Sequence, residues 1–147
     1  MADLELVTRI GAANHGLAIV SVARPDGTVH SSLVNAGVLD HPTTRTAVVG
    51  LVIGGATRKL RYLRAAGRAT LAFQDGWQWV AVEGSIEVAG PDDTAIVSAA
   101  DVPELLRAVF RAAGGTHDDW AEYDRVMAAE RRAAVLVTPE RIVTNRA

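Results

Sequence analysis

The stretch 68-RATLAFQDGWQWVAVEGSIEV-88 decides the fold, because it holds two β-rich runs joined by the turn residues Asp75 and Gly76. We therefore predict an antiparallel hairpin with strands at residues 68–74 and 77–88. In the second strand, alternation of side chains places five residues on one face, namely Val80, Val82, Gly84, Ile86 and Val88. This apolar face predicts the interior of a barrel.

The opposite face of the same strand carries Trp77 and Trp79, followed by Glu83 and Glu87. Two indoles beside carboxylates are unusual on a solvent-exposed face and equally unusual in a core. Large aromatic side chains outside the main core favour an interface or a planar ligand. The alternative is that both tryptophans lie under a helical region.

Further β-rich runs lie on both sides of this hairpin. A turn at residues 24–27, RPDG, predicts a first hairpin. The unbroken apolar run of the third strand indicates burial on both faces. The predicted strands outside the second hairpin span residues 16–23, 28–39, 46–53, 132–138 and 141–144.

Helical patterns separate these strands. We expect three or four helices, and with six or seven strands they predict an α+β fold built on a mainly antiparallel barrel. The first expected helix covers residues 3–14, and the second runs from Thr57 to a C-cap at Gly67. A long helical region follows from Asp92 and Asp93 to Gly114 and Gly115, and Asp101 and Pro103 interrupt it. The last expected helix has its N-terminal cap, a capping box, at residues 116–119.

Composition narrows the class of protein. The 147 residues, 49% hydrophobic and 22% charged, predict a single globular domain over residues 1–147. The absence of cysteine excludes a disulfide framework and a cysteine nucleophile and fits a reducing cytoplasm. A formal net charge of −2 argues against a dedicated nucleic-acid binder.

Other patterns argue against a membrane protein and a metalloprotein. The acidic N-terminal residues Asp3 and Glu5 do not resemble a signal peptide. The longest apolar run, residues 47–56, is about half the length that a membrane span needs. The four histidines show no metal-binding spacing, so we expect no metal site.

Residues 54–68, GGATRKLRYLRAAGR, concentrate five cations in a mildly acidic chain and include its single lysine, Lys59. If Thr57 is the N-cap, Arg58 and Lys59 fall in the first helical turn. Cations there are unfavourable unless an anion lies among them, because the helix dipole is positive at this end. The free N–H groups of the turn and the lysine together suit a phosphate.

Two glycines precede this turn, and Gly54 and Gly55 would let a ligand approach the backbone closely. The alternative for the whole segment is a solvated basic face of an amphipathic helix above Leu60 and Leu63. Asn35 is a further candidate, because a carboxamide inside a strand needs a partner when it is buried. A ligand contact and a structural contact are both open for Asn35.

Four segments resemble the pyridoxamine-5′-phosphate-oxidase-like split β-barrel flavoproteins, and within them the actinobacterial flavin/deazaflavin oxidoreductases that use coenzyme F420. The order and spacing of the four segments are similar to those of the family. They are RPDG (24–27), RKLRYLRAAGRATLAF (58–73), DGWQWVAVEG (75–84) and THDDWAEYDRVMAAERR (116–132). The resemblance implies a split barrel that forms a homodimer with two equivalent cofactor sites at the subunit interface.

The resemblance also implies roles for individual residues. The cofactor phosphate would be held at the end of the third strand and the helix start after it, by Ile53, Gly54, Gly55, Thr57, Arg58 and Lys59. Trp77 and Trp79 match an aromatic strand near the interface, and Asn35 lies on the strand that lines the flavin ring. Arg61 or Arg64 would reach a poly-glutamate tail.

The function implied is hydride transfer from F420 to an unsaturated small molecule. Such chemistry belongs to the cofactor, so the catalytic residues of the chain are unknown at this point. The alternatives are an FMN-dependent oxidase or reductase with the same fold, and a non-catalytic protein that binds flavin or F420.

Overall fold

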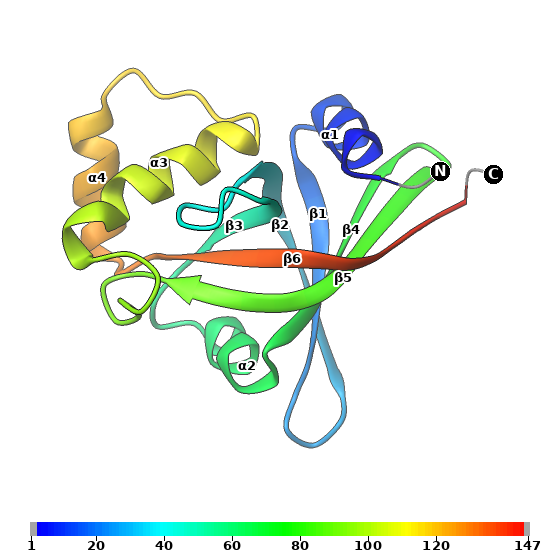
Figure 1. Ribbon diagram of the computed structural model, residues 1–147, viewed down its shortest axis with the longest axis horizontal. Coiled ribbons are helices and arrows are strands. Elements are labelled where there is room, and N and C mark those ends of the chain that lie inside the picture. The colour runs from blue at the N-terminus through cyan, green and yellow to red at the C-terminus, as the bar shows by residue number, and fades with distance from the viewer. Residues whose placement is uncertain (1–2, 146–147) are drawn as a thin grey trace.

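The computed structural model describes residues 3–145, and its centre is a closed barrel of six antiparallel strands (Figure 1). The order around the barrel is β1-β2-β3-β6-β5-β4, and β4 pairs with β1 to close it. The strands are β1 (Leu17–Ala23), β2 (Val29–Asp40), β3 (Ala47–Ile53), β4 (Arg68–Asp75), β5 (Gln78–Ala89) and β6 (Ala133–Thr144). The predicted α+β antiparallel barrel is confirmed.

Four α-helices surround the barrel in the described part of the chain. They are α1 (Leu4–Ala13), α2 (Arg58–Ala66), α3 (Val102–Ala112) and α4 (Trp120–Ala129), and a short 3-10 turn, Ala99–Asp101, precedes α3. Figure 1 shows α3 and α4 together on one side of the barrel, and α1 packs against β2, β4 and β5. No helix within residues 3–145 is long and apolar enough to cross a bilayer.

Two apolar cores hold these layers together. The first fills the barrel and includes Leu6, Val7 and Ile10 of α1 and Leu60 and Leu63 of α2. The second lies between α3–α4 and the outer wall of the barrel. Strand β3 contributes to both cores, which confirms the predicted burial on both of its faces.

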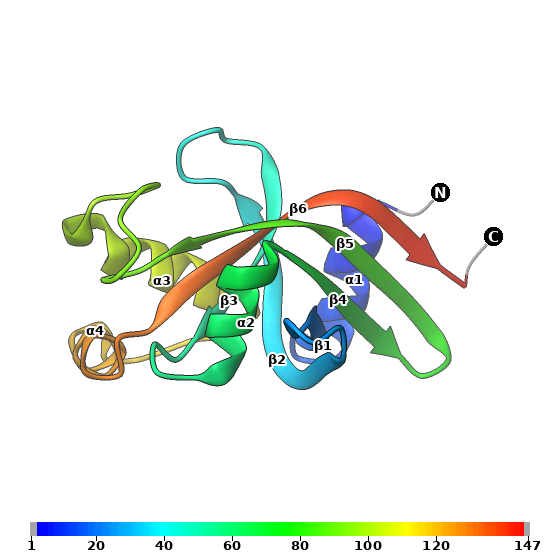
Figure 2. The same cartoon turned by 90° about the horizontal axis from the view of Figure 1, so that it is seen from below.

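The β4–β5 hairpin follows the predicted alternation. Val80 and Val82 are fully buried, and Ile86 and Val88 pack against the barrel core. Trp77 is 94% exposed and Trp79 is 38% exposed. The tip of the hairpin points away from α3 and α4 in both views (Figures 1 and 2), so the alternative that a helical region covers the tryptophans is wrong.

The outer face of the barrel that α3 and α4 leave uncovered carries a continuous apolar row. The strand register aligns its members from β2 across β1, β4 and β5 to β6. Leu33 is 61% exposed, Ile19 41% and Val143 37%. We call this set the apolar row; it consists of Leu33, Ile19, Ala72, Ala81 and Val143.

The two strands predicted at the end of the chain are one long strand, β6, bent at a bulge. The register against β5 shifts between Glu83 and Gly84, where Glu140 is left without an opposite residue. The Glu140 carboxylate accepts hydrogen bonds from the Ser85 N–H at 2.8 Å and from Arg68 at 2.9 Å. A side chain thus accepts a backbone N–H at the point where the bulge disrupts the ladder, and it ties the two strands together there.

The predicted helix beginning at Asp92 and Asp93 is also wrong. These carboxylates pair with Arg131 and Arg64, respectively, and hold a turn, while α3 begins ten residues later with Pro103 in its first turn. The predicted capping box starts too early as well. The N-cap of α4 is Asp119, whose carboxylate accepts the Glu122 N–H at 3.1 Å.

The bulge generates a stability prediction. A Cβ added at Gly84 would lie 1.7 Å from the Thr138 carbonyl oxygen, so Gly84→Ala forces the two backbones apart. We expect a loss of about 3 kcal/mol in the free energy of unfolding, measured by urea denaturation. Gly11→Ala is the control: its Cβ would meet Phe73 at 3.6 Å, an ordinary contact, and stability should stay equal or rise. Equal stability of the two variants would contradict the tight packing at the bulge.

Candidate functional site

An opening beside several of the predicted site residues lies where the barrel splits. Strands β2 and β3 pair only from Ala36–Leu51 to Asp40–Ala47. Beyond Ala36 and Leu51 the strands part, because β2 stays paired with β1 while the end of β3 stays paired with β6. A pocket of about 540 Å³ lies at this split. We call it the split pocket.

The split pocket is walled by β2, β3, the start of α2, and the α3–α4 pair. Five of the nine residues predicted for a cofactor site line it: Asn35, Ile53, Gly54, Thr57 and Lys59. The remaining lining residues are His15, Leu33, Val34, Val52, Val109, Phe110, Ala113, Gly114, Gly115, Tyr123, Met127 and Arg132.

Helix α2 starts at the predicted position. The Thr57 hydroxyl accepts the Leu60 N–H at 3.2 Å, as an N-cap does, and donates to the Gly54 carbonyl at 2.9 Å. Gly67 ends the helix in a left-handed conformation. Because the hydroxyl hydrogen of Thr57 is bonded to Gly54, Thr57 orders the turn rather than offering a donor to the pocket.

The two glycines before α2 have different roles. The Gly55 N–H donates to the Glu130 carbonyl at 3.1 Å, and a Cβ at Gly55 would lie 2.2 Å from the Arg131 carbonyl oxygen. Gly55 is therefore required for packing against the end of α4, and it does not line the split pocket. Gly54 does line it, so close backbone approach applies to Gly54 alone.

Two cations form one end of the split pocket. Lys59 is half-buried, and its ammonium group has no hydrogen-bond or ion-pair partner within residues 3–145. Burial and then the charge of Arg132 lower the pKa of Lys59. Arg132 donates to the Glu130 carboxylate at 2.7 Å. An anion at this end would relieve the repulsion between the two cations.

Sequence reasoning did not identify Arg132. It directly precedes β6, and the pairing of Ala133 with Ile53 places it beside the end of β3. The run of cations at residues 131–132 was visible in the sequence, but the β3–β6 pairing that makes it relevant was not. A correct strand order would have been the signal.

The middle of the split pocket is apolar and aromatic. Phe110, Tyr123 and Met127 line it from α3 and α4. The rings of Phe110 and Tyr123 lie 5.0 Å apart, and the Tyr123 hydroxyl donates to the Leu106 carbonyl at 3.2 Å. Burial raises the pKa of Tyr123. With its hydroxyl bonded to the main chain, Tyr123 contributes an apolar wall suited to a planar group.

His15 and Asn35 form the other end of the split pocket. The Asn35 amide donates to the His15 carbonyl at 2.8 Å. His15 has a left-handed backbone with φ of 57°. A structural contact of Asn35, one of the two alternatives open from the sequence, is therefore present, and its side-chain oxygen has no partner within residues 3–145.

The other predicted residues lie outside the split pocket. Arg58 and Arg61 are exposed on α2, and Trp77 and Trp79 lie at the far hairpin. Arg64 is engaged by the Asp93 carboxylate through two hydrogen bonds, of 3.0 and 2.5 Å. The structure therefore brings Lys59 and Asn35 together with the end of β3 at Ile53. Trp77 and Trp79 of the same chain lie elsewhere.

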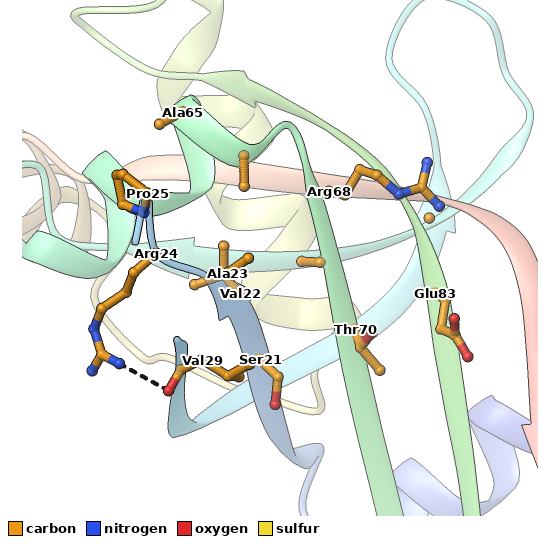
Figure 3. A pocket seen from close by; sticks show the side chains of 13 residues that line it. Ser21, Val22, Ala23, Arg24, Pro25, Val29, Ala65, Arg68, Thr70 and Glu83 are labelled. Carbon is orange, nitrogen blue, oxygen red and sulfur yellow. Dashed lines mark hydrogen bonds between the residues drawn. The ribbon is translucent and has the colours of Figure 1, made fainter. Parts of the chain in front are cut away.

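A second pocket, of about 500 Å³, lies between the β1–β2 hairpin, the end of α2 and strands β4 and β5 (Figure 3). Its cations are already satisfied: Arg24 donates to the Val29 carbonyl at 2.9 Å, and Arg68 pairs with Glu140. Within residues 3–145, no group of three potential metal ligands lies together. The split pocket is thus the better candidate for a charged ligand.

No protein-family model matches the chain. Solved structures do match its fold. A conserved hypothetical protein of Mycobacterium tuberculosis superposes with a TM-score of 0.70 at 18% identity, over 98% of this chain and 84% of that one. A pyridoxamine 5′-phosphate oxidase-related, FMN-binding protein of Nostoc punctiforme superposes with a TM-score of 0.63 at 10% identity, over 95% of this chain and 82% of that one. An F420 reductase superposes with a TM-score of 0.58 at 15% identity, over 86% of this chain and 88% of that one.

These similarities define the fold class. The chain has the split-barrel architecture of pyridoxamine 5′-phosphate oxidase-like proteins, with the same closed antiparallel barrel and surrounding helices. One protein of this fold that binds FMN and one that is an F420 reductase are among its structural neighbours.

The environment of Lys59 predicts a stability change with pH. The folded chain releases the Lys59 proton below the ordinary pKa of 10.5, whereas the unfolded chain holds it. Stability therefore rises as pH rises from the lowered pKa toward 10.5. Lys59→Met should be slightly more stable than the parent at pH 7, by less than about 1 kcal/mol because solvent screens the charge. The gap should shrink near pH 10 in thermal unfolding.

Arg58→Met is the matched control, since Arg58 is the exposed neighbour of Lys59 on the same helical turn. Its stability should follow the parent at both pH values. A Lys59→Met variant less stable than the parent at pH 7 would show that the lysine has a stabilising partner.

Proposed function

We propose that the chain is a cofactor-dependent oxidoreductase that binds a flavin-type cofactor, coenzyme F420, in the split pocket and reduces an unsaturated small molecule. The observation that carries this proposal is the unpartnered Lys59 beside Arg132 at one end of an aromatic-walled pocket. FMN is the second candidate, and the FMN-binding neighbour of the same fold favours it.

The shape and chemistry of the split pocket fit such a cofactor. A flavin or deazaflavin joins an anionic phosphate to a flat, largely apolar ring system. Lys59 and Arg132 provide positive charge at one end, and Phe110, Tyr123 and Met127 provide an apolar wall beside it. A volume of about 540 Å³ lies within the range of small-molecule sites, about 300–1,000 Å³.

These contacts assign different roles to the cofactor and to the residues of the chain. The cofactor supplies the hydride chemistry, and the chain supplies binding, orientation and a water-poor environment. Lys59 and Arg132 would hold the phosphate by charge-assisted hydrogen bonds, and free N–H groups at the start of α2, where Thr57 and Lys59 line the pocket, would add donors. Gly54 would allow the phosphate to approach the main chain.

The resemblance in sequence favours F420 over FMN, and an F420 reductase is among the structural neighbours beside the FMN-binding protein. Arg61 is exposed on α2 and has no ion pair within residues 3–145, so it is the candidate contact for a poly-glutamate tail. Arg64 is not, because Asp93 occupies its guanidinium group.

Cofactor affinity tests the proposal. Lys59→Met and Arg132→Met should each weaken binding of F420 or FMN about 10- to 100-fold, because each removes a hydrogen bond between charged groups worth about 1.5–3 kcal/mol. Fluorescence titration of the purified protein with each cofactor measures the affinity. Arg58→Met, the exposed control, should change it by less than about threefold.

The two cofactors give distinct outcomes in this titration. Tight binding of F420 with weak binding of FMN supports the deazaflavin enzyme, and the reverse supports the FMN enzyme. Failure of both to bind the parent protein at micromolar concentration would refute the proposal.

We also propose that the protein works as a homodimer. The apolar row offers a surface for a second copy, and it reaches the split pocket through Leu33, which belongs to both. A partner placed on this surface would cover the open side of the pocket. The exposed Trp77 and Trp79 would then contact the cofactor or the substrate of the neighbouring subunit, as the resemblance implies.

The apolar row makes the dimer testable. Ile19→Glu places a charge within the row, between Leu33 and Ala72, so it should convert a dimer into a monomer in analytical ultracentrifugation. Ala13→Glu is the control, on the exposed side of α1, and should leave the assembly unchanged. A dimer that survives Ile19→Glu would place the interface elsewhere.

A further inference from the structure

Strands β1 and β4 also separate at one end of their pairing. They pair from Ala18–Phe73 to Ser21–Thr70 and not beyond. Past Ser21, β1 stays paired with β2, and the first residues of β4, from Arg68, stay paired with β5. The second pocket described above, of about 500 Å³, lies at this separation (Figure 3). We call it the β1–β4 groove.

On β1, the main chain of Ala23 faces the groove. At the two ends of the strand, the Gly16 carbonyl accepts the Ala36 N–H at 2.8 Å and the Arg24 N–H donates to the Thr28 carbonyl at 2.7 Å. Residues of β1 with even numbers are therefore the ones hydrogen-bonded to β2, because successive residues of a strand direct their N–H and C=O groups to opposite sides. Ala23 directs its N–H and C=O to the other side, where β4 has separated, so these groups have no strand partner.

On β4, Arg68 is the corresponding residue. Its neighbour Gly67 accepts the Ile86 N–H at 3.0 Å on the β5 side, so the main chain of Arg68 is directed toward β1. Ser85 lies opposite Arg68, and its N–H donates to the Glu140 carboxylate instead. The separated ends of β1 and β4 thus both direct unpaired N–H and C=O groups into the same groove.

The charged side chains of the groove leave one carboxylate without a partner. Arg24 donates to main-chain and side-chain acceptors of its own hairpin, and Arg68 pairs with Glu140. Glu83 is half-buried and makes no hydrogen bond or ion pair within residues 3–145. Arg141 lies opposite Glu83 on β6, but it is exposed and does not form an ion pair with it. Glu83 is therefore an acceptor that lacks a donor.

A hydroxyl group lies beside this carboxylate. Thr70 is directly opposite Glu83 in the β4–β5 register, so their Cβ atoms are about 5 Å apart and both side chains lie on the outer face of the barrel. In the described part of the chain, the Thr70 hydroxyl has no hydrogen-bond partner. Figure 3 shows Thr70 and Glu83 directed to the same side, with Ser21 next to them on β1. One donor group can contact both Thr70 and Glu83.

The remaining wall of the groove is small and apolar. Pro25 and Val29 line it from the β1–β2 hairpin, and Ala65 and Ala66 line it from the end of α2. Val29 is 60% exposed although it is apolar. The volume of about 500 Å³ lies within the range of small-molecule sites, about 300–1,000 Å³. The groove therefore joins hydrogen-bond acceptors and one negative charge to an apolar surface.

We propose that the β1–β4 groove binds a small primary amine with an apolar body. The ammonium group, which has three N–H donors and a positive charge, would contact the Glu83 carboxylate and the Thr70 hydroxyl. The apolar body would lie against Pro25, Val29 and the end of α2. This site shares no lining residue with the split pocket, so the inference does not depend on the cofactor proposed above.

A pair of small probes tests the ligand class. Benzylamine carries a primary ammonium group on an apolar ring, and benzyl alcohol has the same ring without the charge. Saturation-transfer NMR on the full chain should show benzylamine binding at millimolar concentration, with benzyl alcohol at least about 10-fold weaker. Equal binding of the two probes, or no binding of benzylamine, would overturn the proposal.

Substitutions locate the site. Glu83→Gln keeps the size of the side chain and removes its charge, so benzylamine affinity should fall about 10-fold. Thr70→Val keeps the shape and removes the hydroxyl, and we expect a loss of about threefold. Both variants should retain the melting temperature of the parent, because neither side chain has a partner to lose within residues 3–145.

Glu104→Gln is the matched control, since it removes the same charge from an exposed position in the first turn of α3. It should leave benzylamine affinity unchanged, and an equal loss in Glu104→Gln and Glu83→Gln would show only a general attraction to acidic surface residues. The affinity for F420 or FMN should be the same in Glu83→Gln as in the parent. A loss of cofactor affinity in this variant would overturn the separation of the two sites.

Discussion

Strand β6 pairs with β3 along one edge and with β5 along the other, and this double pairing joins the β1–β3 half of the barrel to the β4–β5 hairpin. Its first half is buried on both sides: Val135 and Val137 face the barrel core, and Ala134 and Leu136 face α3 and α4. The two apolar cores therefore meet at one strand. Because Ala133 lies opposite Ile53, the same pairing also places Arg132 beside the start of α2.

The candidate site, in contrast, depends on strands that are not paired, because β2 and β3 separate at one end. Each strand keeps its other neighbour, so the barrel remains closed on the far side while a gap opens between Asn35 and Ile53. Helix α2 begins at one side of this gap and α3 ends at the other. A barrel that is hydrogen-bonded throughout would leave no room for a ligand at this position.

Sequence patterns predicted the parts that depend on local periodicity. The alternation of β5, the two-sided burial of β3, and the start and end of α2 at Thr57 and Gly67 are all confirmed. The errors arose where long-range contacts override local signals. Asp92 and Asp93 look like helix caps, but they bind arginines on distant segments. The bend of β6 depends on Glu140 reaching Ser85, which no local pattern encodes.

The candidate site likewise contains residues that a local pattern predicts and residues that depend on long-range contacts. Lys59 was recognisable because a lone lysine in a first helical turn is electrostatically unusual. Arg132 and His15 were not, since Arg132 requires the strand order, and His15 requires knowledge of the left-handed turn at the end of the split pocket. Gly55 was assigned to ligand approach from sequence, and only the packing of the α4–β6 corner shows its actual neighbour.

That packing links two distant parts of the chain. The Gly55 N–H is bonded to Glu130, and Arg131, which also has a left-handed backbone, occupies the space where a side chain at position 55 would lie. Because the nearest of these atoms is the main-chain oxygen of Arg131, no change of side chain at position 131 makes room for one at position 55. The turn that carries Lys59 and the corner that carries Arg132 are therefore joined through main-chain atoms, and we expect position 55 to remain glycine in related proteins whichever residue stands at position 131.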